Sequence, residues 1–310
     1  MPTLSVPLLL ATTLGAFKKR VPMLDFISLD SRADYIKKGQ TATAHVRTLP
    51  TAGAYGDDGY FSNTNDAQSL LVDVPVVMDQ HTHVTLKLDH LAALSDQKID
   101  IAMEDAAYVL GKTVMDFALT KAALAANLSF TETEAVASTT KETLSKVRAK
   151  MNTNGAAPVR YGLVNGAVAT ELDNDPLITS GDYYGQRSAA NGYLEWQNLC
   201  GFARIQEYTD LPTTVNMTGL FFDQRAIIAR TAVPLDATAL AGQLGIPTVA
   251  STTVQQDAET GIALMAIMHQ QPGTLDLFMT LTLLYGAAAG KQAGSAGTIC
   301  DKAGVRLISA

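Results

Sequence analysis

The stretch VDVPVVMDQHTHVTLKLDH, residues 72–90, leads through LAALSDQKIDIAMEDAAY into VLGKTVMDFALTKAALAANL, which ends at residue 128. Its first part alternates as a half-buried β-strand does. Val84, Leu86 and Leu88 share one face of this strand, while the polar residues between them share the other. The first part of the stretch therefore predicts a β-strand, and the second part follows it directly in the chain.

The second part predicts one long helix over Ala102–Ala126. Its apolar residues recur at helical spacing, and they are Met103, Ala107, Leu110, Val114, Phe117 and Leu124. Acidic residues near its start favour the positive end of the helix dipole. A helix of this length would measure about 35 Å, two to three times an ordinary globular helix. Gly111 costs roughly 1 kcal/mol inside a helix, and we expect it to permit a bend.

The composition describes a folded protein of 310 residues, 47% hydrophobic and only 17% charged, which suggests that partners cover much of its surface. A net charge of −7 argues against a tight grip on nucleic acid, which needs clustered basic residues. Cys200 and Cys300 are the two cysteines, too few for a disulfide framework.

The N-terminal region, Met1–Asp30, shows no clean period and carries three prolines, so we expect an extended arm. The apolar run Leu4–Phe17 is followed, not preceded, by the basic residues Lys18–Arg20, which argues against a signal peptide. No apolar run reaches the length of a membrane helix, so no membrane partner is expected. An apolar arm would need a partner surface.

The remaining chain reads as alternating strands, turns and short helices. Strands over Lys37–Leu49 and Ser69–Asp79 would flank a polar tip over Thr51–Gln68, which predicts a long hairpin loop. A compact α/β unit would follow, with a helix over Glu134–Asn154, a strand over Pro158–Val164 and a helix capped by Asn165.

Further along, loops and strands are expected in turn. Polar or small-residue loops are expected at Ser180–Gly192, Pro234–Thr248 and Ala287–Gly297, and strands at Leu199–Tyr208, Leu220–Phe222, Ile262–Gln270, Thr274–Leu284 and Val305–Ser309.

The sequence contains no complete motif for phosphate binding, metal binding or catalysis. Gly286–Lys291 resembles a phosphate-binding loop, but it is one residue short and has Gln292 where a hydroxyl should bind magnesium. His81 and His83 share a strand face without a third ligand nearby, so a solvent-facing pair is favoured over a metal site. No arrangement supports a Ser-His-Asp or Cys-His site. We therefore predict no catalytic, metal-binding or cofactor-binding residues.

The order of these segments resembles the major capsid proteins of tailed bacteriophages, which share the Hong Kong 97-type shell fold. The likeness rests on the strand VPVVMDQHTHVTLKLD before the long helix, a helix ending in KMNTNG (residues 150–155), the stop LDNDP (172–176) and the terminal strand followed by YGAA (285–288). Each is a common turn or cap, so their order along the whole chain carries the resemblance.

The resemblance implies an α+β fold with an N-terminal arm, an extended β-hairpin loop, a peripheral domain with a long spine helix, and an axial α/β domain. The implied parts are the arm (1–35), the hairpin loop (36–71), the peripheral domain (72–130), the axial domain (131–223) and a return to the peripheral domain (224–310).

The implied function is a structural subunit, not an enzyme, that self-assembles through pentamers and hexamers into an icosahedral shell around double-stranded DNA. Implied partners are a portal, a separate scaffolding protein and an optional decoration protein, with assembly in the host cytoplasm. Expected contacts between subunits fall in the arm, the hairpin tip and the later polar loop: Lys18, Lys19, Arg20, Tyr55, Asp57, Asp58, Tyr60, Phe61, Tyr183, Tyr184 and Arg187.

Two other readings stay open from the sequence. One is an encapsulin-like nanocompartment shell, which encloses a cargo enzyme instead of a genome. The other, from a different class, is a soluble α+β enzyme or binding module.

Overall fold

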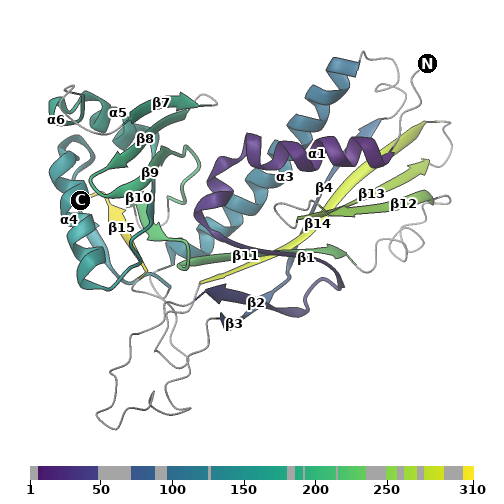
Figure 1. Cartoon of the computed structure of the whole chain (residues 1–310), viewed down its shortest axis with the longest axis horizontal. Coiled ribbons are helices and arrows are strands. Elements are labelled where there is room, and N and C mark those ends of the chain that lie inside the picture. The colour runs from purple at the N-terminus through teal and green to yellow at the C-terminus, as the bar shows by residue number, and fades with distance from the viewer. Residues whose placement is uncertain are drawn as a thin grey trace, which may run out of the picture.

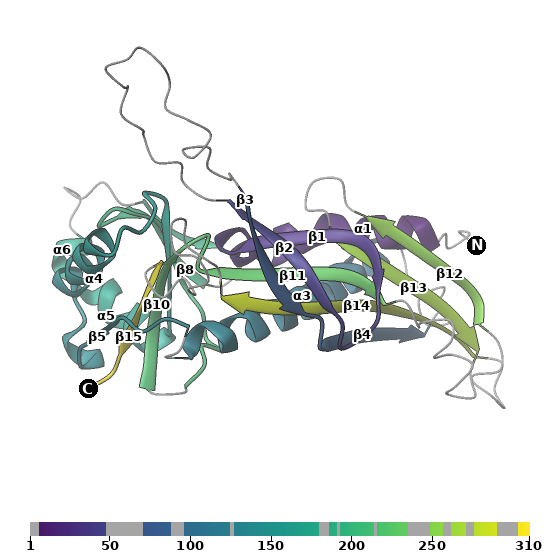
Figure 2. The ribbon, with the colours of Figure 1, turned by 90° about the horizontal axis from the view of Figure 1, so that it is seen from below.

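The computed structural model describes residues 6–47, 71–87, 96–124, 127–179, 186–190, 193–213, 216–234, 249–256, 262–270, 276–289 and 303–310. They form two lobes, each built on its own sheet (Figure 1). A two-stranded ribbon lies against the first lobe (Figure 2). Among these residues no helix is both long enough and apolar enough to cross a membrane.

The first lobe contains a six-stranded sheet in the order β1-β11-β14-β13-β12, with β4 on the other edge of β14. Its strands are β1 (Ser28–Ile36), β4 (Gln80–Lys87), β11 (Ile227–Pro234), β12 (Val249–Gln256), β13 (Ala263–Gln270) and β14 (Leu277–Ala289). Only β1 pairs in parallel, with β11; the other pairs are antiparallel.

The long helix α3, Asp96–Ala123, covers one face of this sheet and confirms the predicted helix, although it begins earlier. Met103, Ala107, Leu110 and Val114 are buried as their spacing predicts. Leu124, expected on the same face, lies one residue beyond the end of the helix and is exposed. The expected strand is β4, and its Val84 and Leu86 pack against the same core.

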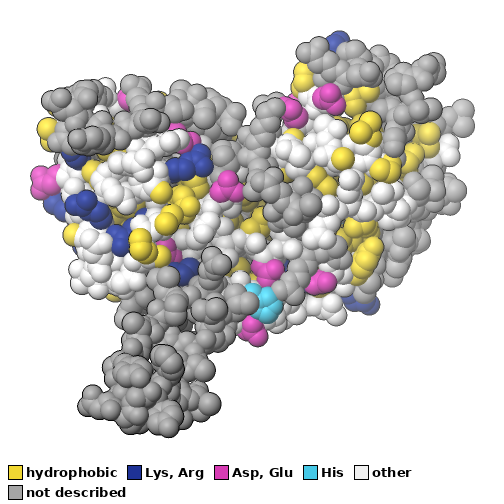
Figure 3. All heavy atoms as spheres, in the orientation of Figure 1, with side chains coloured by type: hydrophobic (Ala, Val, Ile, Leu, Met, Phe, Trp, Pro, Cys, Tyr) yellow, Lys and Arg dark blue, Asp and Glu magenta, His cyan; other side chains and the backbone are white. Residues whose placement is uncertain are grey.

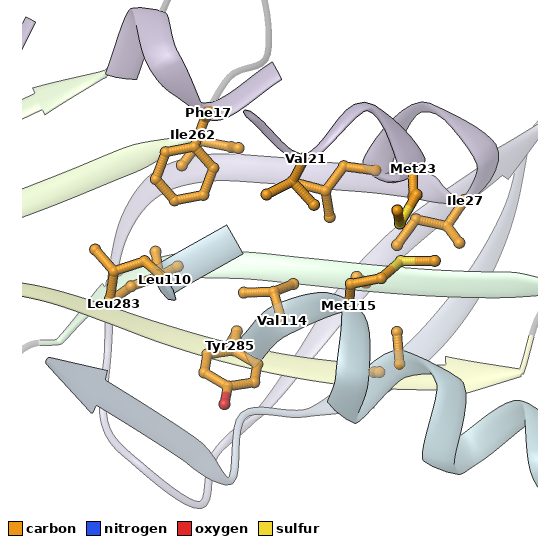
Figure 4. Close-up of a cluster of buried hydrophobic side chains, with 14 of the residues drawn as sticks. Phe17, Val21, Met23, Ile27, Leu110, Val114, Met115, Ile262, Leu283 and Tyr285 are labelled. Carbon is orange, nitrogen blue, oxygen red and sulfur yellow. The ribbon is translucent and has the colours of Figure 1, made fainter. Parts of the chain in front are cut away.

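The helix α1, Val6–Arg20, packs against α3, and the short 3-10 helix η1, Pro22–Phe26, follows it. A Cβ on Gly111 of α3 would lie 3.0 Å from Cγ2 of Val21 and 3.3 Å from Cε1 of Phe17. Figure 4 shows Phe17 and Val21 lying over α3 beside Leu110 and Val114. Close packing of α1 on α3, which we call the helix seam, therefore explains this glycine, and the bend stays a prediction.

The second lobe contains a seven-stranded sheet in the order β5-β15-β10-β6-β9-β8-β7. Its strands are β5 (Thr131–Thr133), β6 (Arg160–Val164), β7 (Gln186–Ala190), β8 (Tyr193–Leu199), β9 (Phe202–Glu207), β10 (Met217–Asp223) and β15 (Gly304–Ile308). Its helices are η3 (Val136–Ser138), α4 (Lys141–Thr153), α5 (Gly166–Asn174) and α6 (Pro176–Thr179).

Local signals in this lobe act as the sequence predicts. Asn165 caps α5, because its side chain accepts a hydrogen bond from the Val168 N–H at 2.9 Å. Leu144, Val147 and Met151 of α4 are buried against the sheet, and Gly155 has a positive φ just after the helix. The opposite face of the sheet joins the core of the first lobe through residues such as Leu163.

The structure corrects the expected N-terminal arm. It is not extended over residues 6–20 but helical, and its Leu10, Leu14 and Phe17 are buried in the chain's own core. Pro7 does not prevent the helix, because a proline in the first turn removes an N–H that has no helical partner. The chain then extends only in β1, which adds an edge strand to the first sheet.

Other corrections concern strands. The single strand expected over Leu199–Tyr208 is split between β8 and β9 by a turn in which Cys200 and Gly201 have positive φ. The loop expected over Ser180–Gly192 includes β7, and the loop expected from Ala287 begins inside β14. We expected all C-terminal strands in the first lobe, but β15 pairs with β10 and β5 in the second.

Candidate assembly surfaces

The ribbon consists of β2 (Thr41–Arg47) and β3 (Leu71–Val77), the two strands predicted to flank the hairpin tip. They pair antiparallel over their whole lengths, so the chain leaves and re-enters the ribbon at the paired residues Arg47 and Leu71. The predicted tip between them lies outside the described residues. The ribbon therefore presents that segment from a defined point on the first lobe.

The foot of the ribbon is fixed to the sheet by what we call the ribbon seam. Alternate ribbon residues, including Ala44, Val46 and Val76, are buried against Ile228 and Leu284 of the sheet. The remaining alternate side chains of β2, such as those of Thr41 and Thr43, are exposed. One face of the ribbon is thus part of the core.

Gly286 of β14 sets how closely the ribbon approaches. A Cβ at this position would overlap the carbonyl oxygen of Val77 and lie 2.9 Å from Cγ1 of Val76. The same glycine opens the sequence that resembled a phosphate-binding loop. Its place inside a strand, paired with Arg230 of β11, removes that resemblance, because the motif needs a loop before a helix.

Charged groups connect the ribbon to β1 and β11. The backbone N–H of His45 donates to Asp30 at 2.8 Å, and the His45 ring lies 2.8 Å from Asp73 on the neighbouring strand. The buried Arg230 side chain pairs with Asp34 at 3.0 Å and with Asp30 at 3.8 Å. Since a buried guanidinium needs an anion, these carboxylates stabilise the sheet edge beneath the ribbon.

A polar contact joins α3 to the second lobe. Lys112 lies 3.1 Å from Asp116 and 2.5 Å from Asp210, and the Tyr208 hydroxyl donates to Asp116. Burial lowers the pKa of Lys112, but its bonds to Asp210 and Asp116 outweigh burial and raise that pKa overall. Burial, reinforced by Asp116, raises the pKa of Tyr208. Sequence reasoning missed this contact, because its members are far apart in the chain.

A second polar contact fixes the crossing from β10 to β11. The fully buried Asp223 accepts hydrogen bonds from the Ala157 N–H at 2.9 Å and from the Arg225 N–H at 2.8 Å. Its carboxylate also pairs with the Arg225 guanidinium at 2.6 Å. The chain therefore passes between the lobes through a turn held by a satisfied buried ion pair.

His81 and Asp175 have hydrogen-bond partners within the fold. His81 bonds Thr282 at 2.5 Å, and burial, helped by His83 and Lys38, lowers the pKa of His81. Among the residues described, no group of three or more His, Cys, Asp or Glu side chains could hold a metal ion. Asp175 accepts hydrogen bonds from the N–H groups of Lys141 and Leu177, as an aspartate in a turn commonly does.

The expected contact residues are only partly placed. Lys18, Lys19 and Arg20 belong to the last turn of α1, and Arg187 stands opposite Trp196 in the β7–β8 pair. The side chains of these four residues lie outside the described part of the chain. The other expected contact residues lie wholly outside it: Tyr55, Asp57, Asp58, Tyr60, Phe61, Tyr183 and Tyr184. On the face in Figure 3, basic side chains are most frequent over the second lobe, where no single patch dominates.

Comparison with known proteins gives a likeness of structure only. No protein-family model matches the chain, and no curated protein matches it. The capsid structure of the cyanophage P-SCSP1u matches with a TM-score of 0.50 and 14% identity, covering 92% of this chain and 86% of that one. Mycobacterium phage Che8 (TM-score 0.46, 16% identity, 87% and 85% covered) and the mature capsid of bacteriophage PhiM1 (0.45, 10%, 92% and 85%) match less well.

The match to the cyanophage capsid shows the fold. This chain has the mixed α+β fold of a phage capsid protein, in agreement with the resemblance to Hong Kong 97-type shells.

Proposed function

We propose that this chain is the major capsid subunit of a tailed double-stranded DNA phage. The observation that carries the proposal is the capsid fold, which extends over 92% of the chain. Copies form pentamers and hexamers that close into an icosahedral shell, and their role is structural instead of catalytic. This assignment is favoured over a nanocompartment shell and over a soluble enzyme or binding module.

In this proposal the parts of the chain have the family's roles. Residues 36–71 reach neighbouring subunits, and 72–130 and 224–289 form the peripheral domain together with α1 and β1. Residues 131–223 form the axial domain together with β15. The foot of the ribbon supports this arrangement, because Arg47 and Leu71 are paired at the end of a ribbon that is packed on the first lobe. Tyr55, Asp57, Asp58, Tyr60 and Phe61 then contact the adjacent subunit.

The remaining expected contacts lie elsewhere on the subunit. Lys18, Lys19 and Arg20 would pair with acidic groups of a neighbour, and Tyr183, Tyr184 and Arg187 would meet other axial domains. Like charges at the rim of such contacts would select against wrong neighbours.

The partners follow from the same proposal. A separate scaffolding protein guides assembly in the host cytoplasm, a portal occupies one vertex, and a decoration protein binds some shells from outside. The DNA is enclosed without sequence-specific binding. A net charge of −7 suits a container, because a wall that bound DNA tightly would slow packing and release.

Electron microscopy of the expressed full chain tests the proposal. Closed shells or tubes are the expected result, with the scaffolding protein co-expressed if the chain alone stays unassembled. A protein that remains monomeric or dimeric by light scattering, with and without scaffold and at low and high salt, would overturn the proposal.

The contact residues need their own experiment. Asp57→Lys and Asp58→Lys together should lower the yield of particles. Thr43→Lys, on the exposed face of the ribbon and outside the expected contact residues, should lower that yield less. Circular dichroism of the unassembled protein shows whether each variant is folded. Equal particle yields for both variants would remove the hairpin tip from the proposed contacts.

A further inference from the structure

The edges of the sheets differ in how they are protected. An edge strand offers unpaired N–H and C=O groups to any other chain, and proteins normally guard such edges with charges, prolines or short strands. Among the described strands, all edges but one carry a charged residue or a proline. The guards are Asp30, Arg32 and Asp34 on β1, Arg47 on β2, Asp73 and Pro75 on β3, Lys87 on β4, Glu132 on β5 and Arg187 on β7.

The exception is β12, which reads VASTTVQQ and contains neither a charge nor a proline. It has eight residues, and within the described part of the chain it pairs only with β13. Figure 2 shows β12 as the outermost strand at the end of the first lobe far from the second. Thr252 is exposed, and Val254 is half-buried on the same face. Nothing in this sequence discourages another strand from pairing with it.

We propose that β12 is an interface between two copies of this chain, in which β12 of one copy pairs antiparallel with β12 of the other across a two-fold axis. The occupant follows from the edges themselves. Each of the other described edge strands would place a charged residue or a proline against β12, whereas β12 of a second copy would place neither there. The sheets of the two copies then form one continuous sheet. This proposal rests on the proposed function, because a closed shell contains two-fold contacts between capsomers.

The symmetry makes a precise geometric demand. In an antiparallel ladder, directly opposite residues point to the same face of the sheet. A two-fold axis perpendicular to the sheet places each residue on the same face as the identical residue of the other copy. Two directly opposite residues therefore have numbers that differ by an even amount, because side chains alternate between the faces of a strand. It follows that one residue of β12 must lie directly opposite the identical residue of the other copy. For an eight-residue strand centred on its partner, that residue falls within 251–254.

A cysteine scan tests this demand. With Cys200 and Cys300 replaced by serine, Ser251→Cys, Thr252→Cys, Thr253→Cys and Val254→Cys are made singly and oxidised after assembly. Since a disulfide requires Cα atoms within about 7 Å, one or two of these variants should give at least about tenfold more covalent dimer than Thr43→Cys on the guarded ribbon. Particles that form normally while none of the four crosslinks above that control would overturn the proposal.

A charge exchange at the crosslinking position adds an independent test. Two lysines, or two glutamates, directly opposite one another repel, while a lysine opposite a glutamate attracts. The Lys variant and the Glu variant should each assemble poorly alone, and an equimolar mixture should recover most of the wild-type particle yield. A mixture no better than its components would contradict the self-pairing.

The outcomes separate this inference from the proposed function. Particles without crosslinks would reject the β12 pairing and keep the capsid assignment. Crosslinked dimers without particles under any condition would keep the pairing and reject the capsid assignment.

Discussion

The helix seam and the ribbon seam are each built around a glycine, but different atoms face the two glycines. Gly111 meets the ends of the Phe17 and Val21 side chains, which can rotate or shift. Gly286 meets the backbone of Val77, which the antiparallel pairing of the ribbon holds in place. The helix seam is therefore adjustable and the ribbon seam is not, although both bury a similar kind of apolar surface.

The largest effect expected is from emptying the helix seam. Phe17→Ala removes a side chain that is 1% exposed, and loss of a buried phenylalanine costs about 3–5 kcal/mol because a cavity remains. Denaturant unfolding of the unassembled protein measures this. Leu8→Ala, at a residue of the same helix that is 66% exposed, serves as the control and should cost much less. Equal losses from the two changes would show that α1 does not pack as described.

The next largest effect tests the rigidity of the ribbon seam. Gly286→Ala forces the ribbon away from β14 and should cost roughly 3 kcal/mol, the upper part of the range for overpacking. Hydrogen exchange of the β2 and β3 amides should rise along with this loss. A variant as stable as the parent, with unchanged exchange, would show that the backbone at Val77 yields after all.

A smaller effect concerns the pH dependence of the contact between β14 and β4, the strand that follows the ribbon. Because the pKa of His81 is lowered in the folded protein, the folded state disfavours the charged ring, and stability present at neutral pH should decline as the pH falls below about 6.5. His81→Gln should flatten that decline in thermal unfolding between pH 7.5 and 5.5. His83→Gln should flatten the decline less, because burial lowers the pKa of His81 more than the neighbouring His83 does. A flattening of equal size there would contradict the role of His81.

The smallest effect is expected from Gly111→Ala. The alanine gains about 1 kcal/mol of helix propensity, and a shift of Phe17 and Val21 by a few tenths of an ångström offsets it. The free energy of unfolding should therefore change by less than about 1 kcal/mol. A loss as large as that of Gly286→Ala would erase the difference between the two seams. Adding Phe17→Leu to Gly111→Ala should relieve whatever crowding remains.

Local signals predicted much of the fold. The spacing of Met103, Leu110 and Val114 predicted α3, the Asn165 cap predicted the start of α5, and Gly155 marked the end of α4. The expected start of α4 at Glu134 was wrong, because α4 begins at Lys141. These features depend on residues within a few positions of one another. The helix α1 was missed because LLLATTLGAF is apolar on nearly all sides, which hides the period that its buried residues do have.

Nonlocal features were beyond such signals. Nothing near β15 indicates that it pairs with β10 and β5, and nothing near Asp116 indicates Tyr208. The turn between β8 and β9 was missed because Cys200 adopts a positive φ, which is uncommon outside glycine. Gly286 did carry a signal, since a glycine within a strand often marks a close approach of another backbone.

The position of β15 also determines when the second lobe can be completed during synthesis. This strand lies between β5 and β10, yet residues 224–303 are made after β10 and before it. Until β15 emerges from the ribosome, the second lobe lacks an inner strand, and one edge of β10 is unpaired. A nascent chain thus carries an unfinished lobe, and only a chain translated as far as residue 308 can offer a complete one to other copies.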